Sequence, residues 1–433
     1  MTTTYADFLA AKQARIPMAG RNVNPLDVHS MLHDWQAEIV VWACSVGRAA
    51  IWADTGLGKT VMQVEWARFM ARGGRALIVA PLAVCAQTVR EASKVGVDVT
   101  YVRSDLEAHA PGVYVTNYEM VQHFDPTEFA AVVLDEASIL KQADGKTRTM
   151  LIRHFEPVPY RLACTATPAP NDPEELTSQA EFLGHMERAQ MLAAYFIHDD
   201  AGWRLKGHAR RPMMTWMATW AIALRKPSDL GYPDTGYDLP GLKIESHLIH
   251  VEMEAEGQLF PTDLGGVGGR AQVRRETLHE RCAKAAELID AEPDEPWLLW
   301  CGLNAEAAEL ARLTGATNVD GSLSPEVKAQ LLLDFADGKI MRLVTKPSIA
   351  SMGMNWQHCA RMAFVGLSDS YESYYQAIRR CYRYGQPRVV VAHVILSELE
   401  GQIAVNVARK EREAGAITTQ LVHAMQAARL ETS

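Results

Sequence analysis

Short apolar runs bounded by turn residues recur along the chain from about residue 29, and segments of helical period separate them. In the first part of the chain these runs are Ala49–Ala53, Ala76–Ala80, Val113–Thr116, Val132–Leu134 and Arg161–Cys164. Continuous apolar runs of this length are typical of strands covered on both faces, and the segments between them suit crossover helices. The pattern therefore predicts a mostly parallel sheet flanked by helices over residues 29–171.

A second block of the same kind is expected over residues 243–400. Its candidate strands are Lys243–Val251, Trp297–Cys301, Met341–Thr345, Met362–Val365 and Val389–Ile395. The sequence thus predicts an α/β protein with two such domains, an arrangement suited to clamping a ligand between them.

Three further segments complete the predicted organisation. Residues 1–28 are expected to form an N-terminal arm, and residues 401–433 a C-terminal helix. Residues 172–242 carry many methionines and aromatic residues with few strand signals, so we interpret them as a helical insertion that ends in a Gly- and Pro-rich linker. Trp203 and Trp216 are interpreted as core residues of this insertion, with base stacking as the alternative.

Composition narrows the class of protein. A length of 433 residues with 48% hydrophobic residues suits two or three domains. The net charge of -9 argues against a broad basic surface, so a nucleic acid would have to bind in a local groove. The seven cysteines show no CxxC spacing, which argues against a zinc site or a disulfide framework and favours a reducing cytoplasm. We expect neither a signal peptide nor a membrane span.

A phosphate-binding loop is predicted between the run Ala49–Ala53 and the helical segment that follows it. Gly56 and Gly58 allow the backbone to curl so that N–H groups face a phosphate at the start of a helix. Lys59 would reach the β- and γ-phosphates, and the hydroxyl of Thr60 would bind Mg²⁺. The residues expected to hold ATP and Mg²⁺ here are Asp54, Thr55, Gly56, Leu57, Gly58, Lys59 and Thr60.

Two carboxylates follow the run Val132–Leu134. Because the ends of parallel strands face the ligand crevice, Asp135 is expected to hold Mg²⁺ and Glu136 to activate the attacking water. Such a pair is also common as a solvated surface feature, but the phosphate loop upstream favours the catalytic interpretation. Thr165 and Thr167, at another strand end, would sense the state of the γ-phosphate.

Together these segments resemble the superfamily 2 helicases, and among them the SNF2-like translocases. The matching segments are Leu32–Gln36, Thr55–Thr60, Leu77–Leu82, Val115–Glu119, Asp135–Ser138, Thr165–Pro168, Asp320–Ser322, Met352–Trp356 and Gln376–Gln386. They occur in the family's order from about residue 30 to about residue 400. The resemblance implies two RecA-like lobes, each a mostly parallel sheet flanked by helices, with the helical insertion between motif III and lobe 2.

The resemblance also assigns roles outside the phosphate loop. Gln36 would read adenine, and Gly353 would contact the nucleotide. Arg380 and Arg383, three residues apart on an expected helix, would share one face and act as catalytic arginine fingers on the γ-phosphate. The nucleic-acid contacts would come from Pro81, Thr116, Asn117 and Asn355.

Three departures from the family pattern stand out. Ser138 occupies the place of the usual histidine, and Arg379 that of a glycine. Ala350 and Ser351 replace a glycine pair. None of these changes removes a group expected to touch phosphate. The short chain resembles a minimal phage or bacterial member of the family.

The sequence therefore predicts an ATP-dependent DNA helicase or translocase that uses ATP and Mg²⁺ and acts on duplex or single-stranded DNA. We expect a monomer in a bacterial or phage-infected cytoplasm, with replication or recombination proteins as candidate partners and no membrane. An RNA helicase and a nucleic-acid-binding module with a decayed ATPase remain alternatives. The intact Lys59, Asp135 and Glu136 argue against decay, and the sequence leaves strand separation and duplex translocation both open.

Overall fold

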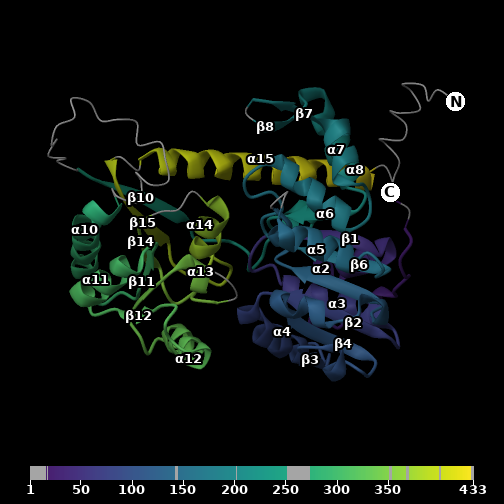
Figure 1. The fold of residues 1–433 in the computed structure, drawn as a ribbon, viewed down its shortest axis with the longest axis horizontal. Helices are drawn as coiled ribbons and strands as arrows, with labels where there is room; N and C mark the ends of the chain where they lie inside the picture. Colours follow the sequence, from purple (N-terminus) through teal and green to yellow (C-terminus); the bar gives the residue numbers. More distant parts are fainter. Residues whose placement is uncertain are drawn as a thin grey trace. The chain divides into compact units, whose positions relative to one another are not determined.

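The chain folds as two α/β units, each built on its own parallel sheet. The computed structural model describes residues 16, 18–141, 145–200, 202–250, 274–350, 354–366, 370–398 and 401–430. Unit 1 contains the chain up to residue 235 and again from residue 412, and unit 2 contains residues 236–411. Figure 1 follows the elements of both units along the sequence. The predicted class, two sheets flanked by helices, is confirmed.

The sheet of unit 1 has seven strands that pair in parallel throughout. Their order across the sheet is β3 (Val99–Tyr101), β4 (Gly112–Asn117), β2 (Arg75–Ala80), β5 (Ala131–Asp135), β6 (Tyr160–Cys164), β1 (Arg48–Ala53) and β9 (Ala221–Leu224). The central strands β1, β5 and β6 are almost wholly buried, as the apolar runs in their sequences require.

Helices connect these strands, as the period of the intervening segments predicts. The α-helices of unit 1 are α2 (Asp34–Val46), α3 (Lys59–Ala71), α4 (Leu82–Lys94), α5 (Lys146–His154), α6 (Leu176–Phe182), α7 (Arg188–Tyr195) and α8 (Arg210–Met217). Because β1, β5 and β6 are neighbours and parallel, their carboxyl ends lie side by side at one edge of the sheet. The segments that follow these strands are therefore brought together at that edge.

The insertion contains the expected helices α6, α7 and α8, but it also contains strands that the sequence analysis missed. The strand β9 joins the main sheet beside β1, with Ala50 opposite Ala221. The backbone N–H of Asp54 donates to the carbonyl of Leu224 over 3.0 Å, so the insertion supports the start of the phosphate loop. The short run Ala-Ile-Ala-Leu becomes a strand because the free edge of β1 offers it a partner.

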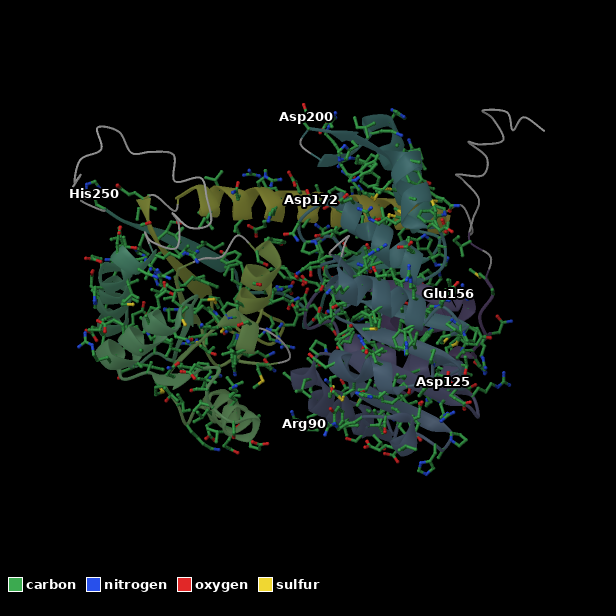
Figure 2. The ribbon with its side chains drawn as sticks, viewed as in Figure 1. Arg90, Asp125, Glu156, Asp172, Asp200 and His250 are labelled. Atoms are coloured by element: carbon green, nitrogen blue, oxygen red, sulfur yellow. The ribbon has the colours of Figure 1, made fainter. Side chains whose placement is uncertain are left out.

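The insertion also contains a two-stranded antiparallel hairpin that the sequence analysis did not predict, made of β7 (Phe196–Asp199) and β8 (Gly202–Leu205). It lies outside the main sheet (Figure 1), and Figure 2 labels Asp200 at its turn. Trp203 is 37% exposed on β8, so its interpretation as a core residue is wrong. Trp216 is buried against Tyr195 and Trp220, as expected.

Unit 2 is built on a six-stranded sheet whose pairings are also all parallel. Its strand order is β10 (Leu242–Ile249), β15 (Val390–Ser397), β14 (Arg361–Val365), β11 (Trp297–Cys301), β13 (Arg342–Thr345) and β12 (Thr317–Val319). The helices of this part of the chain are α10 (Leu278–Ala291), α11 (Asn304–Thr314), α12 (Pro325–Ala336), α13 (Pro347–Ala350), α14 (Tyr371–Ile378) and α15 (Gly401–Leu430).

A buried ion pair joins α10 to the first turn of α11. Arg281 Nη1 lies 2.7 Å from Glu306 Oε1, and both side chains are fully inaccessible. The second carboxylate oxygen of Glu306 accepts hydrogen bonds from the N–H groups of Gly302 (2.8 Å) and Leu303 (2.9 Å). Each charge is therefore fully coordinated, which a buried carboxylate needs to remain ionised.

The last helix, α15, begins in unit 2 and continues into unit 1, whose share starts at Arg412. Figure 1 shows it as one uninterrupted helix, as the sequence predicts over Gln402–Leu430. Within unit 1 its side chains bond the insertion and the segment after β9. The contacts are Arg210 Nη1 to Gln420 Oε1 (3.3 Å), Arg225 Nη1 to Thr419 Oγ1 (3.1 Å) and Gln426 Nε2 to the carbonyl of Asp229 (3.0 Å).

All seven cysteines are buried and carry free thiols. Among the helices of the described ranges, none combines the length and the apolar character that a membrane crossing requires.

Candidate functional site

The loop between β1 and α3 has a backbone that only glycine adopts easily at two positions. Gly56 and Gly58 have φ angles of 87° and 74°, in the left-handed region. A Cβ atom at Gly58 would also collide with the side-chain amide of Gln36. Because α3 begins at Lys59, the free N–H groups of its first turn lie directly after this curve. The loop therefore has the curved backbone, followed by a helix amino end, that the predicted phosphate binding requires.

Lys59 lies within the curve of this loop. Its Nζ atom donates hydrogen bonds to the carbonyls of Ala53 (2.8 Å) and Asp54 (3.3 Å). The ammonium group and the amino end of α3 thus supply positive potential at the same place. A polyphosphate chain is the ligand that such a combination favours.

Gln36 is built into the loop rather than standing beside it. Its Nε2 atom donates to the carbonyl of Leu57 over 2.9 Å, and its Oε1 atom accepts from the N–H of His33 over 2.9 Å. The side chain is only 5% exposed. Gln36 therefore ties the start of α2 to the phosphate loop, and both ends of its amide are engaged within the protein.

Asp135 is the last residue of β5, and Glu136 follows it directly. In the sheet, β6 lies between β5 and β1, the strand that leads into the phosphate loop. Asp135 is 6% exposed, and its Oδ1 atom accepts hydrogen bonds from Gln63 Nε2 (2.7 Å) and the N–H of Glu136 (3.1 Å). Burial raises the pKa of the Asp135 carboxyl, while the hydrogen bond from Gln63 and the charge of Lys59 oppose that rise. Such a desolvated carboxylate is well suited to a hard cation such as Mg²⁺.

Glu136 is held in a conformation that is rare for a residue with a side chain. Its φ angle is 54°, in the left-handed region, and this turn directs the chain away from the end of β5. Thr165 Oγ1, at the end of β6, donates to Glu136 Oε2 over 3.5 Å. The N–H of Thr167 in turn donates to Thr165 Oγ1 over 3.1 Å. Of the two threonine hydroxyls, therefore, that of Thr165 reaches the acidic pair, whereas that of Thr167 has no hydrogen-bond partner among the described residues. The strained backbone of Glu136 is of the kind that concentrates at functional sites.

Ser138 stays close to the acidic pair although it differs from the family pattern. Its hydroxyl donates to the carbonyl of Glu136 over 3.5 Å, and the side chain is 5% exposed. It supports the turn after β5 locally.

The sequence analysis missed three residues that support this edge of the sheet. Gln63 lies one helical turn after Lys59, fully buried, and donates to Asp135. Tyr118 donates its hydroxyl to the carbonyl of Asp135 over 2.5 Å. Gln179, in the insertion, accepts from Trp52 Nε1 (2.8 Å) and donates to the carbonyl of Pro168 (2.9 Å). Gln63 stands at a position where the helical pattern predicts an apolar residue, and that mismatch could have singled it out.

In unit 2 the predicted arginines lie side by side, but not on a helix. The helix α14 ends at Ile378, and the N–H of Arg380 bonds to the residue three positions earlier, so the chain has turned out of the α-helical path. The expectation that Arg380 and Arg383 share a helical face is therefore wrong. They come together because Nη1 of each donates to the carbonyl of Met354, over 3.1 and 3.3 Å.

Arg380 is the more firmly fixed of the pair. It is 5% exposed, and its Nη2 and Nε atoms donate to Gln376 Oε1 (2.8 Å) and to the Gln376 carbonyl (2.9 Å). Arg379, which replaces the family's glycine, lies between the rings of Tyr375 and Tyr382 at 5.6 and 5.4 Å. Its bulk is thus accommodated by stacking within the same segment. Gly353 lies outside the described residues.

The four candidate nucleic-acid contacts differ in accessibility. Pro81, at the start of α4, is partly exposed, and Asn355 is exposed in a segment without regular structure. Thr116 is fully buried and Asn117 is 4% exposed, with its amide engaged by Tyr101 and Glu119. The side chains of Thr116 and Asn117 are thus not available to a ligand at the surface, whereas Pro81 and Asn355 are.

The arrangement in unit 1 has the parts that nucleoside triphosphate hydrolysis requires. A curved loop and Lys59 face the phosphate position, Asp135 offers a buried carboxylate for a cation, and Glu136 offers a second carboxylate for a water molecule. All of them lie at the carboxyl edge of the parallel sheet, where ligands bind in folds of this kind.

Comparison with known proteins gives two matches to sequence families and a structural likeness. Residues 28–192 match the SNF2-related domain, and residues 280–385 match the helicase conserved C-terminal domain. No curated protein sequence matches the chain significantly. Among solved structures, the chain is similar to the Sulfolobus solfataricus SWI2/SNF2 ATPase core in complex with dsDNA. The identity is 16% and the TM-score 0.45, over 92% of this chain and 96% of that chain.

Proposed function

Because this chain belongs to the SNF2-like branch of the superfamily 2 helicases, a class of nucleic-acid-dependent ATPases, we propose that it hydrolyses ATP to move along duplex DNA. The observation that supports the proposal most strongly is the group formed by Lys59, Asp135 and Glu136 at one edge of the unit 1 sheet. The SNF2-related match over residues 28–192 contains all three residues, and the resemblance to SNF2-like translocases favours DNA over RNA as the track.

The chemistry follows from the position of each group. Lys59 and the loop N–H groups bind the β- and γ-phosphates and neutralise their charge. Asp135 would hold Mg²⁺, and the ion would supply neutralisation of the charge on the triphosphate. Glu136 orients a water molecule for attack on the γ-phosphorus and accepts its proton. Gln36, which bonds the phosphate loop through the carbonyl of Leu57, would read the adenine.

Arg380 and Arg383 complete the machinery in this proposal. Their guanidinium groups lie close enough to share one acceptor, the carbonyl of Met354. Two adjacent guanidinium groups can stabilise the charge that develops on a γ-phosphate, a contribution on the order of 10³–10⁵ in rate in related phosphoryl transfer. Movement along the track follows if ATP binding and hydrolysis change how the units grip the sugar–phosphate backbone, a contact that is neutral to sequence. The partly exposed Pro81 and the exposed Asn355 are candidates for this grip.

The decisive experiment measures ATP turnover by the full chain without nucleic acid, and then with duplex DNA, single-stranded DNA and RNA. We expect a several-fold stimulation that is largest with duplex DNA. Equal turnover in all four conditions would refute the motor, and a preference for RNA would select the RNA-helicase alternative. Triplex displacement without strand separation would then identify a translocase, whereas strand displacement would identify a helicase.

Variants test the individual roles. Lys59→Ala and Glu136→Gln should abolish turnover, and Lys94→Ala, at an exposed lysine of the same unit, should not. Arg383→Ala should leave ATP binding intact but slow hydrolysis about 10³-fold or more, whereas Arg312→Ala, at an exposed arginine of unit 2, should leave hydrolysis unchanged. A turnover-competent Lys59→Ala variant would refute the role assigned to Lys59, whereas absence of ATP turnover by the unchanged chain would support the decayed-ATPase alternative.

We further propose that the chain acts as a monomer in a reducing cytoplasm, since seven buried free thiols suit that compartment. Proteins of replication or recombination remain its candidate partners.

A further inference from the structure

Three potential metal ligands converge in unit 2, on a face of the sheet that the proposed ATP chemistry does not use. Glu245 and His247 lie on β10, and His393 lies opposite Glu245 on β15. Because side chains alternate along a strand, Glu245 and His247 point to the same face, and the register adds His393 to it. The cluster Glu245–His247–His393 is thus assembled by a strand pairing rather than by a local motif.

The ligand atoms of this cluster are spaced as one ion would require. His247 Nε2 lies 3.0 Å from His393 Nδ1, and His393 Nδ1 lies 3.3 Å from Glu245 Oε2. One ligand atom from each of the three residues lies within 4.8 Å of the others. A zinc ion with ligands at about 2.0–2.1 Å in tetrahedral geometry holds its ligand atoms roughly 3.3 Å apart. Small movements of Glu245 and His247 would therefore suffice to close the site.

The surroundings hold two of the three ligands in place. His393 is 5% exposed, and its ring stacks on Trp297 with centroids 5.6 Å apart. Lys243 Nζ bonds the other carboxylate oxygen of Glu245 over 2.5 Å, so the Oε2 atom remains directed toward His393. Partners that orient metal ligands from outside are typical of metal sites. His247 and Glu245 are partly exposed, which gives an ion a path from solvent.

We propose that Glu245, His247 and His393 bind one divalent transition-metal ion of the zinc class, with water as the remaining ligand. Two imidazole nitrogens and one carboxylate oxygen suit zinc better than Mg²⁺ or Ca²⁺, which prefer all-oxygen sites. The ion would fasten β10, at the edge of the sheet and first among the strands of unit 2, to β15, the strand that leads into α15. None of the three ligands belongs to the residues of the proposed ATPase, so the metal site and the ATPase can be refuted independently of each other.

The test uses the full chain, freed of metal by a chelator and titrated with Co²⁺, whose visible absorption reports tetrahedral nitrogen and oxygen ligands. We expect one Co²⁺ per chain, displaced by Zn²⁺, and a higher thermal midpoint with Zn²⁺ than without it. His247→Ala and Glu245→Gln should each weaken binding at least tenfold and abolish the thermal shift. Both positions are partly exposed, so these variants should remain folded.

His250 provides the matched control. It lies just beyond the end of β10 (Figure 2), is well exposed and pairs with Glu398. His250→Ala should bind Co²⁺ and Zn²⁺ like the unchanged chain. Equal affinity in the His247→Ala and unchanged chains would place the ion elsewhere and overturn the proposal. Failure of the unchanged chain to bind either ion would also overturn it, leaving a hydrogen-bonded histidine pair.

Discussion

Gln63 offers the sharpest test of how the buried carboxylate at the end of β5 works. Its Nε2 atom donates to Asp135 Oδ1 over 2.7 Å, while its own Oε1 atom has no hydrogen-bond partner among the described residues. The side chain is fully buried, and its hydrogen bond to a charged group is the one to Asp135. Gln63→Met keeps most of the volume, removes that donor and also removes the unsatisfied carbonyl. The variant should therefore fold.

The size of the effect follows from the charge of the acceptor. A hydrogen bond to a charged group contributes about 1.5–3 kcal/mol, which corresponds to roughly 10- to 150-fold in an equilibrium constant. Loss of an outer partner of a metal-binding carboxylate typically lowers metal affinity or activity about 10–100-fold, in agreement. The Gln63 bond also opposes the rise that burial imposes on the pKa of Asp135, so that pKa should rise further in the variant.

The assay measures DNA-stimulated ATP turnover against Mg²⁺ concentration and against pH. Gln63→Met should need at least about tenfold more Mg²⁺ for half-maximal turnover, and the acid limb of its pH profile should move to higher pH. Gln87→Met, the same exchange at a partly exposed position on α4, should behave like the unchanged chain. If Gln63→Met showed an unaltered Mg²⁺ requirement and an unaltered acid limb, Asp135 would not be the residue that holds the metal.

Three further substitutions probe the loop and the two cores. Gly58→Ala forces a residue with a Cβ into the left-handed conformation, which costs about 1–2 kcal/mol, and displaces Gln36, so the KM for ATP should rise about tenfold. An unchanged KM would show that the conformation of Gly58 does not matter for ATP binding. Burial raises the pKa of Glu175 from 4.5 to about 7, so between these values the native state keeps a proton that the unfolded state has lost, and the stability of the fold decreases as the pH rises. In Glu175→Gln the thermal midpoint should therefore depend less on pH between about pH 5 and pH 8. A pH dependence like that of the unchanged chain would contradict this. Arg281→Met leaves the Glu306 carboxylate buried without its partner, so the free energy of unfolding of unit 2, measured with denaturant, should fall by about 3–5 kcal/mol. A fall below about 1 kcal/mol would show that Glu306 does not carry a buried charge.

The local parts of the fold and the site could be predicted from the sequence. Long apolar runs such as Trp297–Cys301 match their strands, because their composition alone selects a buried strand. The phosphate loop was predictable because two glycines, a lysine and the following helix act within a few consecutive residues. Asp135 and Glu136 were predictable because the carboxyl end of a parallel strand has a fixed relation to the ligand edge.

The parts that depend on distant partners could not be predicted. The strand β9 forms only because β1 lies beside it, about 170 residues away in sequence, and a four-residue apolar run is ambiguous without that partner. Gln63 acquires its role from Asp135, which follows 72 residues later. The Glu245–His247–His393 cluster depends on the register of β10 against β15, and the arginine pair on a helix that ends at Ile378.

The path of α15 has a consequence for dividing this protein into pieces. Its final part buries Ile417, Leu421, Val422 and Met425 and belongs to unit 1, although it follows unit 2 in sequence. A chain cut after residue 400 therefore loses none of the unit 2 sheet, yet it strips an apolar surface and three hydrogen bonds from the amino-terminal half. The integrity of unit 1 thus depends on a segment that follows unit 2 in sequence, and unit 1, unlike unit 2, does not correspond to one contiguous stretch of the chain.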